Sequence, residues 1–140
     1  MRVSMRVVIL GCGRVGSGLA EKLAAEGHQV TVIEQDREAF RRLSPDFPGV
    51  QVVGLGIDED VLRRAGIEQA DAFVAAAPDD NMNIMAAQVA KEIFGVPRVI
   101  ARVFDPQRQE IYQSLGLETI SSTALAVEFM YKALLTRGRG

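Results

Sequence analysis

The sequence predicts an α/β fold, in which helices cover both faces of a doubly wound parallel sheet. Short apolar runs rich in Val and Ile alternate along the chain with segments of helical spacing. Such alternation is typical of parallel strands joined by right-handed crossovers. The runs are continuously apolar, as expected for strands buried on both faces. The 140 residues suffice for one domain with a sizeable core.

Six apolar runs are predicted to be strands, which gives a six-stranded sheet. They lie at residues 7–10, 30–33, 50–53, 72–76, 99–103 and, more weakly, 118–120. Between them, Val15, Leu19 and Leu23 recur every four residues and predict one face of a helix. Further helices are expected at 36–43, 58–65, 80–94 and 106–115. Glycines stand where these helices should end, at Gly27, Gly66, Gly95 and Gly116.

A glycine-rich loop joins the first predicted strand to the first helix. It reads Gly11-Cys12-Gly13-Arg14-Val15-Gly16, the pattern G-x-G-x-x-G in its strand-to-helix context. The first glycine permits a tight turn, the second lets a pyrophosphate approach the backbone, and the third lets helix and strand pack closely. The helix N-terminus would then hold phosphates, which predicts a Rossmann-like nucleotide site. The alternative is a glycine turn that only packs the helix onto the sheet.

An acidic residue ends the second predicted strand. Glu34 lies 23 residues beyond Gly11, where a carboxylate binds ribose hydroxyls, and Gln35 follows it. A carboxylate there repels a 2′-phosphate and favours NAD over NADP, although Arg37 nearby weakens that preference. ATP, ADP and AMP carry the same ribose and stay open as ligands. Arg14 is either a cation over the phosphates or an exposed arginine of the first turn.

Composition narrows the class of protein. Sixteen basic and 18 acidic residues give a net charge of −2, which argues against a nucleic-acid partner. The single cysteine, Cys12, permits no internal disulfide, and no apolar stretch nears the roughly 18 residues of a membrane span. We therefore expect a cytoplasmic protein without direct membrane insertion. Cys12 itself is expected to be a small side chain facing the pocket, with a redox switch as the alternative.

Catalytic groups are scarce. The only histidine, His28, follows Gly27 in a predicted surface turn, and no Ser-His-Asp set, metal-ligand cluster or G-x-x-x-x-G-K-[ST] loop is present. The sequence therefore favours a binding module over an enzyme. A NAD-dependent oxidoreductase, or the nucleotide-binding domain of one, is the alternative.

The C-terminal segment 123–135 is predicted to be a helix that is apolar on all sides. Only Glu128 and Lys132 interrupt its apolar residues, which are Leu125, Val127, Phe129, Met130, Tyr131, Leu134 and Leu135. A helix with one buried face needs a single apolar stripe, so the excess indicates an interface. We expect residues 1–122 to form the nucleotide-binding domain and residues 123–140 a crossover helix and tail of a homodimer. Burial of the helix within its own domain is the alternative.

Several motifs in order resemble one family. GCGRVG, VTVIEQD, residues 54–58, AAAPDDNMN and RVIARVFDP together are similar to the RCK domain, also called the TrkA-N or KTN domain. The resemblance covers residues 5 to about 135. It implies a cytoplasmic regulatory subunit that binds NAD(H) or ATP, ADP or AMP and gates a membrane-embedded potassium transporter or channel. It also implies dimers that build a ring.

The resemblance also implies roles for single residues. Ala76 and Ala77 match a loop over the nucleotide, Arg102 a residue that in some relatives reaches a phosphate, and Asp79 and Asp80 a loop that in some relatives carries a divalent metal. From the residues alone, Asp79 or Asp80 is expected to cap the start of a helix, with a metal or regulatory role as the alternative. Arg102 in an apolar strand needs either a phosphate or a carboxylate beside it.

Two departures from the family pattern make the predicted pocket more apolar. Leu55 stands where the family often has an aspartate, and Ala77 where a threonine is common. Both changes remove polar groups and leave the choice of nucleotide open.

Overall fold

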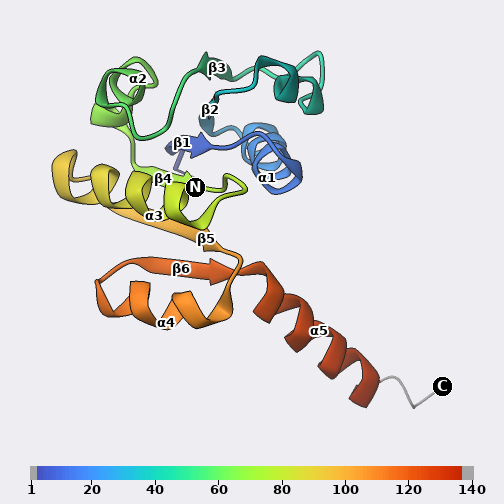
Figure 1. The fold of residues 1–140 in the computed structure, drawn as a ribbon. Coiled ribbons are helices and arrows are strands. Elements are labelled where there is room, and N and C mark those ends of the chain that lie inside the picture. Colours follow the sequence, from blue (N-terminus) through green and yellow to red (C-terminus); the bar gives the residue numbers. More distant parts are fainter. Residues whose placement is uncertain (1–2, 137–140) are drawn as a thin grey trace.

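The structure is a computed structural model that describes residues 3–136, and its six strands form one parallel sheet (Figure 1). The order β3-β2-β1-β4-β5-β6 places the first strand in the centre. The predicted α/β fold with a doubly wound six-stranded parallel sheet is therefore confirmed. The strands are β1 (Arg6–Leu10), β2 (Gln29–Glu34), β3 (Val50–Val53), β4 (Ala72–Ala75), β5 (Arg98–Val103) and β6 (Glu118–Ser121).

Alternate residues of β1 enter two different cores. Val7 and Ile9 pack with α1 and the segment after β2, whereas Val8 and Leu10 pack with α2 and α3. Both faces of the strand are thus buried, which explains why the run is apolar throughout. The helices that cover the sheet are α1 (Arg14–Ala25), α2 (Glu59–Arg64), α3 (Asp80–Gln88) and α4 (Pro106–Ser114).

Two predicted helices differ in type from a plain α-helix. The segment predicted at 36–43 is the 3₁₀ helix η1 (Arg37–Arg42), with Phe40 and Leu43 buried three residues apart, the spacing that a 3₁₀ turn aligns. The helix predicted at 80–94 ends as α3 at Gln88 and continues as the π-helical η3 (Val89–Ile93). A short 3₁₀ turn, η2 (Ile67–Gln69), precedes β4.

Several glycines occupy positions where a positive φ or close backbone packing disfavours a side chain. Gly27, Gly66, Gly95 and Gly116 all have positive φ after helical segments, as expected. Gly16 serves close packing instead, because a Cβ there would lie 1.9 Å from the carbonyl oxygen of Gly11. This contact brings the first turn of α1 against the end of β1.

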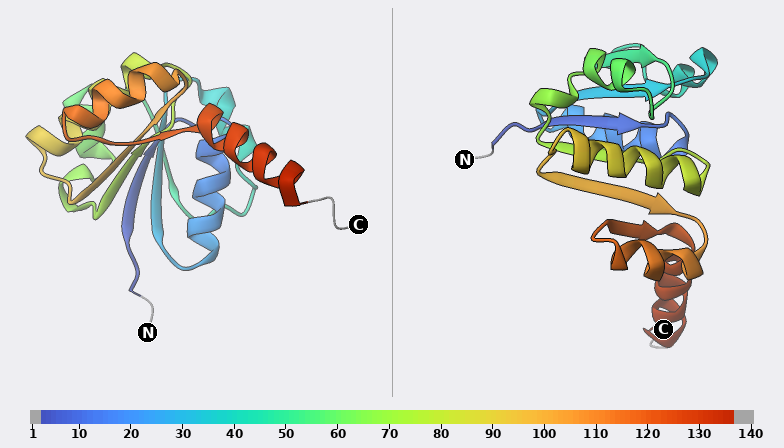
Figure 2. Two further views of the ribbon diagram at one scale, coloured as in Figure 1. Left: turned by 90° about the horizontal axis from the view of Figure 1, so that it is seen from below. Right: turned by 60° about the vertical axis from the view of Figure 1, so that its left-hand side comes forward.

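The last helix, α5 (Ser122–Thr136), projects from the edge of the sheet beyond β6 (Figures 1 and 2). None of its residues is buried, and Leu134 is 77% exposed. Burial within its own domain, the alternative to an interface, is therefore wrong. The predicted tail at 137–140 lies outside the described residues. Between residues 3 and 136, no helix is both long and apolar enough to cross a membrane.

Replacement of Gly16 tests the packing of α1 on β1. We expect Gly16→Ala to lower the free energy of unfolding by about 3 kcal/mol, because its methyl group must displace backbone. Gly18→Ala is the matched control, since a Cβ there meets nothing within 4 Å. The control should raise stability by about 0.5–1 kcal/mol through helix propensity. Urea unfolding measures both variants, and equal effects would contradict the packing role of Gly16.

Candidate functional site

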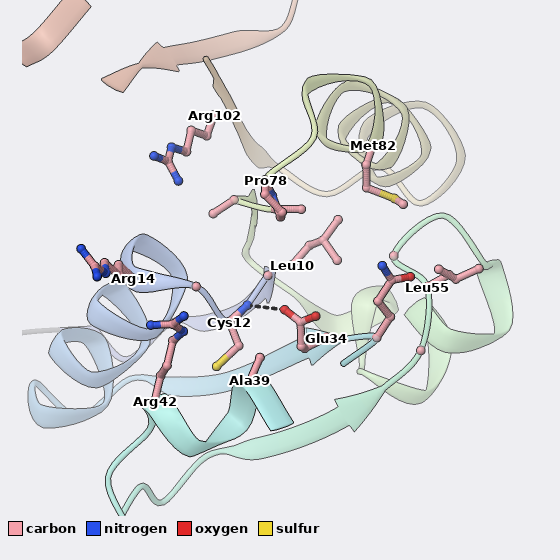
Figure 3. Close-up of a pocket in the computed structure, with 17 residues that line it drawn as sticks. Leu10, Cys12, Arg14, Glu34, Ala39, Arg42, Leu55, Pro78, Met82 and Arg102 are labelled. Carbon is pink, nitrogen blue, oxygen red and sulfur yellow. Dashed lines mark hydrogen bonds between the residues drawn. The ribbon is translucent and has the colours of Figure 1, made fainter. Parts of the chain in front are cut away.

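A cavity of about 460 Å³ opens at the carboxyl ends of the strands (Figure 3). It lies where the chain passes from β1 to β2 on one side and β4 on the other, the usual ligand position in doubly wound sheets. Ten of the predicted site residues border it: Gly11, Cys12, Gly13, Arg14, Glu34, Gln35, Leu55, Ala76, Ala77 and Arg102. Contacts between these residues and a ligand stay predictions.

The glycine loop forms the floor of the cavity. Gly11 has a φ of 105° and donates its N–H to the carbonyl of Ile33 at 2.8 Å. Gly13 is the N-cap of α1 and makes no side-chain cap hydrogen bond. The first N–H groups of α1 are therefore left for an outside acceptor, and the helix dipole favours an anion there.

Glu34 presents its carboxylate between two backbone segments of the cavity. Its Oε1 accepts from the N–H of Cys12 at 2.8 Å, and its Oε2 accepts from the N–H of Asp36 at 3.0 Å (Figure 3). These bonds hold the carboxylate beside the glycine loop, where a ribose would follow the phosphates. Each oxygen keeps a further lone pair for a hydroxyl donor.

Three arginines border the cavity. Arg14, Arg42 and Arg102 gather on one side in Figure 3, and none forms an ion pair with a carboxylate of the described chain. Arg102 lies over the ring of Phe104, 4.1 Å from its centroid, and donates to Ser122 Oγ at 3.3 Å. A carboxylate partner for Arg102, one of the two expectations, is absent among residues 3–136.

The opposite side of the cavity is apolar. Leu10, Leu55 and Met82 lie away from the arginines (Figure 3), and the loop of Gly54 and Gly56 follows β3. A Cβ on Gly56 would lie 2.4 Å from Leu10 Cδ1, so this loop packs directly on the core. The cavity therefore has a cationic side and an apolar side, with Glu34 between them.

Buried Asn83 holds the loop after β4. Its Oδ1 accepts from the N–H of Ala77 at 2.8 Å, and its Nδ2 donates to the carbonyls of Ala77 and Arg102 at 2.8 and 3.0 Å. One amide thus ties the cavity wall of β4 to that of β5. Sequence reasoning missed this residue, whose signal is a polar side chain on the buried face of α3.

The two aspartates before α3 hold backbone groups. Asp79 caps α3 by accepting from the N–H groups of Asn81 and Met82, as expected. Asp80 instead accepts from the N–H groups of Phe104 and Asp105, at 2.7 and 3.1 Å. No cluster of three potential metal ligands occurs in the described chain.

Cys12 borders the cavity, but its side chain has no exposed surface. It packs with Ile9, Ala20 and Phe40 in the core beneath α1. Burial, assisted by the negative charge of Glu34, raises the pKa of the Cys12 thiol to about 11. The thiol is thus protonated near neutral pH, which disfavours the redox alternative.

Three predicted site residues lie outside the cavity wall. Gly16 packs against Gly11, Val15 is 43% exposed on the outer side of α1, and Arg37 is exposed at the start of η1. η1 carries Arg42 to the cavity in place of Arg37. Sequence reasoning missed seven lining residues: Leu10, Ala39, Arg42, Gly54, Gly56, Pro78 and Met82. His28 lies far from the cavity wall and accepts from the N–H of Met5.

The sheet order, the glycine loop and the placement of Glu34 define a Rossmann-like domain. The model of the TrkA-N domain matches residues 7–123, and the chain belongs to this family. The resemblance seen in the sequence is thereby confirmed.

Curated relatives carry names from potassium transport, not names of enzymes. The chain is 51% identical over 134 residues to the Trk system potassium uptake protein TrkA of Streptomyces coelicolor, covering 96% of the chain and 60% of that protein. It is 34% identical to a TrkA homolog of Methanothermobacter thermautotrophicus, over 95% of the chain and 61% of that protein. The chain thus spans about 60% of the length of these relatives.

Solved structures share the fold at low sequence identity. The TrkA-N domain of the inner membrane protein ybaL from Escherichia coli has a TM-score of 0.83 at 22% identity, covering 96% of this chain and 99% of that one. The Kef C-terminal domain of Shewanella denitrificans in its AMP-bound form has a TM-score of 0.80 at 23% identity, covering 96% and 83%. The GsuK channel bound to NAD has a TM-score of 0.81 at 21% identity, covering 98% and 24%.

The reactivity of Cys12 tests its burial. With a pKa of about 11, roughly one thiol in a thousand is ionised at pH 8. We expect an aromatic disulfide reagent to label the native protein very slowly at pH 8 and the urea-unfolded protein within minutes. Cys12 is the single cysteine, so the signal has one source. Rapid labelling of the native protein would contradict a buried thiol.

Proposed function

We propose that this chain is the nucleotide-binding regulatory domain of a potassium uptake transporter or channel, and that it binds an adenine nucleotide, NAD(H) or ATP, ADP or AMP. One observation carries the proposal: three arginines without an ion-pair partner among residues 3–136 and the uncapped N-terminus of α1 border the same cavity as Glu34. Cationic groups and free N–H groups suit phosphates, and the carboxylate suits a ribose diol.

The names of structural neighbours support this class of ligand. They include an AMP-bound form of a Kef domain, GsuK bound to ADP and the GsuK channel bound to NAD. Glu34 suits all three, because none of them carries a 2′-phosphate, whose negative charge would face its carboxylate.

The cavity wall favours binding over catalysis. Its charged side chains are Arg14, Glu34, Arg42 and Arg102, and Glu34 already accepts two backbone hydrogen bonds. No histidine, lysine, tyrosine or serine lines it within residues 3–136. A hydride transfer would need a group to polarise or deprotonate the substrate, and this wall offers none at that position. A regulatory role accounts for the same residues without such a group.

We also propose dimerisation through α5, which its exposed apolar surface supports. Phe129, Met130 and Leu134 are 66%, 67% and 77% exposed, and Ile120 on the edge strand β6 is 42% exposed. A monomer rarely leaves so many neighbouring apolar side chains in water. A second copy, with its own α5 crossing over, would cover this surface. Such dimers would associate into a ring beneath a membrane-embedded potassium transporter or channel, which places the chain in the cytoplasm.

A short route connects the cavity to α5. Arg102 lines the cavity and donates to Ser122 Oγ, the first residue of α5, while Thr123 Oγ1 donates to the carbonyl of Phe104. A phosphate that draws Arg102 toward the glycine loop would change the support of α5, which links ligand binding to dimer geometry. Small-angle scattering tests this route, and a profile unchanged by saturating ADP would contradict it.

A carboxylate placed in the glycine loop tests nucleotide binding. A Cβ on Gly13 meets nothing within 4 Å, so Gly13→Asp should fold normally. We expect it to weaken binding at least a hundredfold, because its charge would face the phosphates. Calorimetry with NADH, NAD, ATP, ADP and AMP measures the affinities.

Gly18→Asp is the matched control, because Gly18 has equal space but lies outside the cavity. It should bind like the unmodified chain. Retained affinity in Gly13→Asp, or no binding of any of the five nucleotides by the unmodified chain, would contradict the proposed site. In cells that produce the protein, Gly13→Asp should also change rubidium uptake, and unchanged uptake would argue against regulation through this site.

Charge reversal on α5 tests the dimer. We expect the unmodified chain to elute as a dimer at micromolar concentration and Phe129→Glu to elute as a monomer, because a buried carboxylate would oppose association. Ile93→Glu is the control, since Ile93 is 55% exposed on η3 and should leave the dimer intact. Size-exclusion chromatography with light scattering distinguishes these outcomes. A monomeric unmodified chain would contradict the dimer.

A further inference from the structure

In the proposed site, the base would lie at an end of the cavity that has few side chains able to recognise it by hydrogen bonds. It is the side away from the arginines, where Leu10, Leu55 and Met82 lie (Figure 3). Leu55 is 45% exposed and Met82 is half-buried, so both present apolar surface to the opening. Since the faces of every purine are apolar and polarisable, such a surface binds a purine ring without regard to its substituents.

Several polar groups of the neighbouring loop already have partners within the chain. Gly54 donates its N–H to the carbonyl of Glu34 at 3.2 Å, and the carbonyl of Leu55 accepts from the N–H of Asp58 at 3.1 Å. The carboxylate of Asp58 caps α2 by accepting from the N–H groups of Asp60 and Val61. The one carboxylate of this loop is therefore directed toward a helix.

Among the described residues that line the cavity, Gln35 is the one with an amide side chain. Its exposed amide has a donor and an acceptor that exchange places by a rotation of 180°. It can accept from the exocyclic amine of adenine or donate to the O6 carbonyl of hypoxanthine or guanine. Strong discrimination requires a fixed partner that the wrong base leaves unpaired, and a rotatable, exposed amide does not impose this.

We propose that the site accepts purine nucleotides with little discrimination between adenine, hypoxanthine and guanine, and that Leu55 sets this tolerance. The inference rests on the proposed nucleotide-binding function and adds how the ligand is chosen. Selectivity lies at the other end of the cavity, where Arg14, Arg42 and Arg102 have no ion-pair partner in the described chain. Phosphate number, rather than base identity, determines affinity there.

Calorimetry of the unmodified chain with ADP, IDP, GDP and AMP tests the inference. We expect ADP, IDP and GDP to bind within about fivefold of one another, and AMP at least tenfold more weakly than ADP. IDP is the most direct comparison with ADP, because hypoxanthine changes the exocyclic group without the extra 2-amino group of guanine. IDP binding more than fiftyfold weaker than ADP would overturn this inference while leaving the proposed function intact. Binding of none of the four would overturn both.

Leu55→Asp supplies the fixed acceptor that the loop lacks. We expect it to keep ADP binding within about threefold and to weaken IDP at least tenfold, because a carboxylate that faces the 6-substituent of the purine accepts from the adenine amine but repels the O6 carbonyl. Leu55→Met is the control that preserves apolar contact and should leave the ratio of the two affinities unchanged. An unchanged ratio in Leu55→Asp would show that residue 55 does not face the base and would overturn its assigned role.

Discussion

The close approach of α1 to the end of β1 is the constraint on which the rest of the site depends. Gly16 leaves no room for a Cβ against the carbonyl of Gly11, and Gly11 itself has a positive φ. Together they let the chain turn from strand to helix within a few residues and point the N-terminus of α1 at the crevice. The carboxylate of Glu34 then bonds the N–H of Cys12 in the same turn. Without this packing, neither the open N–H groups nor the carboxylate would face a common space.

The side chains around that cavity carry more positive than negative charge, which favours an anionic ligand. Three arginines and one carboxylate border it, although the whole chain carries a net charge of −2. The positive charge is therefore local, and the low polarity of the Leu10, Leu55 and Met82 side strengthens its effect on a bound phosphate. Within residues 3–136 these arginines form no ion pair, whereas Arg98 on the neighbouring surface forms a short ion pair with Glu118. The contrast indicates that the cavity arginines are available for a ligand.

The second half of the sheet links this crevice to the exposed helix. Asn83 and Asp80 bind backbone groups at the end of β5, and Arg102 and Phe104 there contact the first residues of α5. The end of β5 thus forms part of the cavity wall and also contacts the first residues of α5. Under the proposed function, a small movement of this segment on ligand binding would be amplified along α5, a 15-residue helix with no buried residue of its own.

The sequence by itself determined the fold class, the number of strands, the glycine loop and Glu34, because these depend on local periodicity and on short-range spacing. It also indicated the exposed character of α5, since its apolar residues surround the helix. The sequence predicted Arg37 as a site residue, whereas in the structure Arg42 borders the cavity. The turn type of η1 determines which of the two arginines lies there. Asn83, Leu10 and Met82 were not predicted as site residues either, because in the sequence they resemble ordinary helix and strand residues. Only the tertiary structure decided their roles, because the strand order brings the ends of β1, β3, β4 and β5 together from distant parts of the chain.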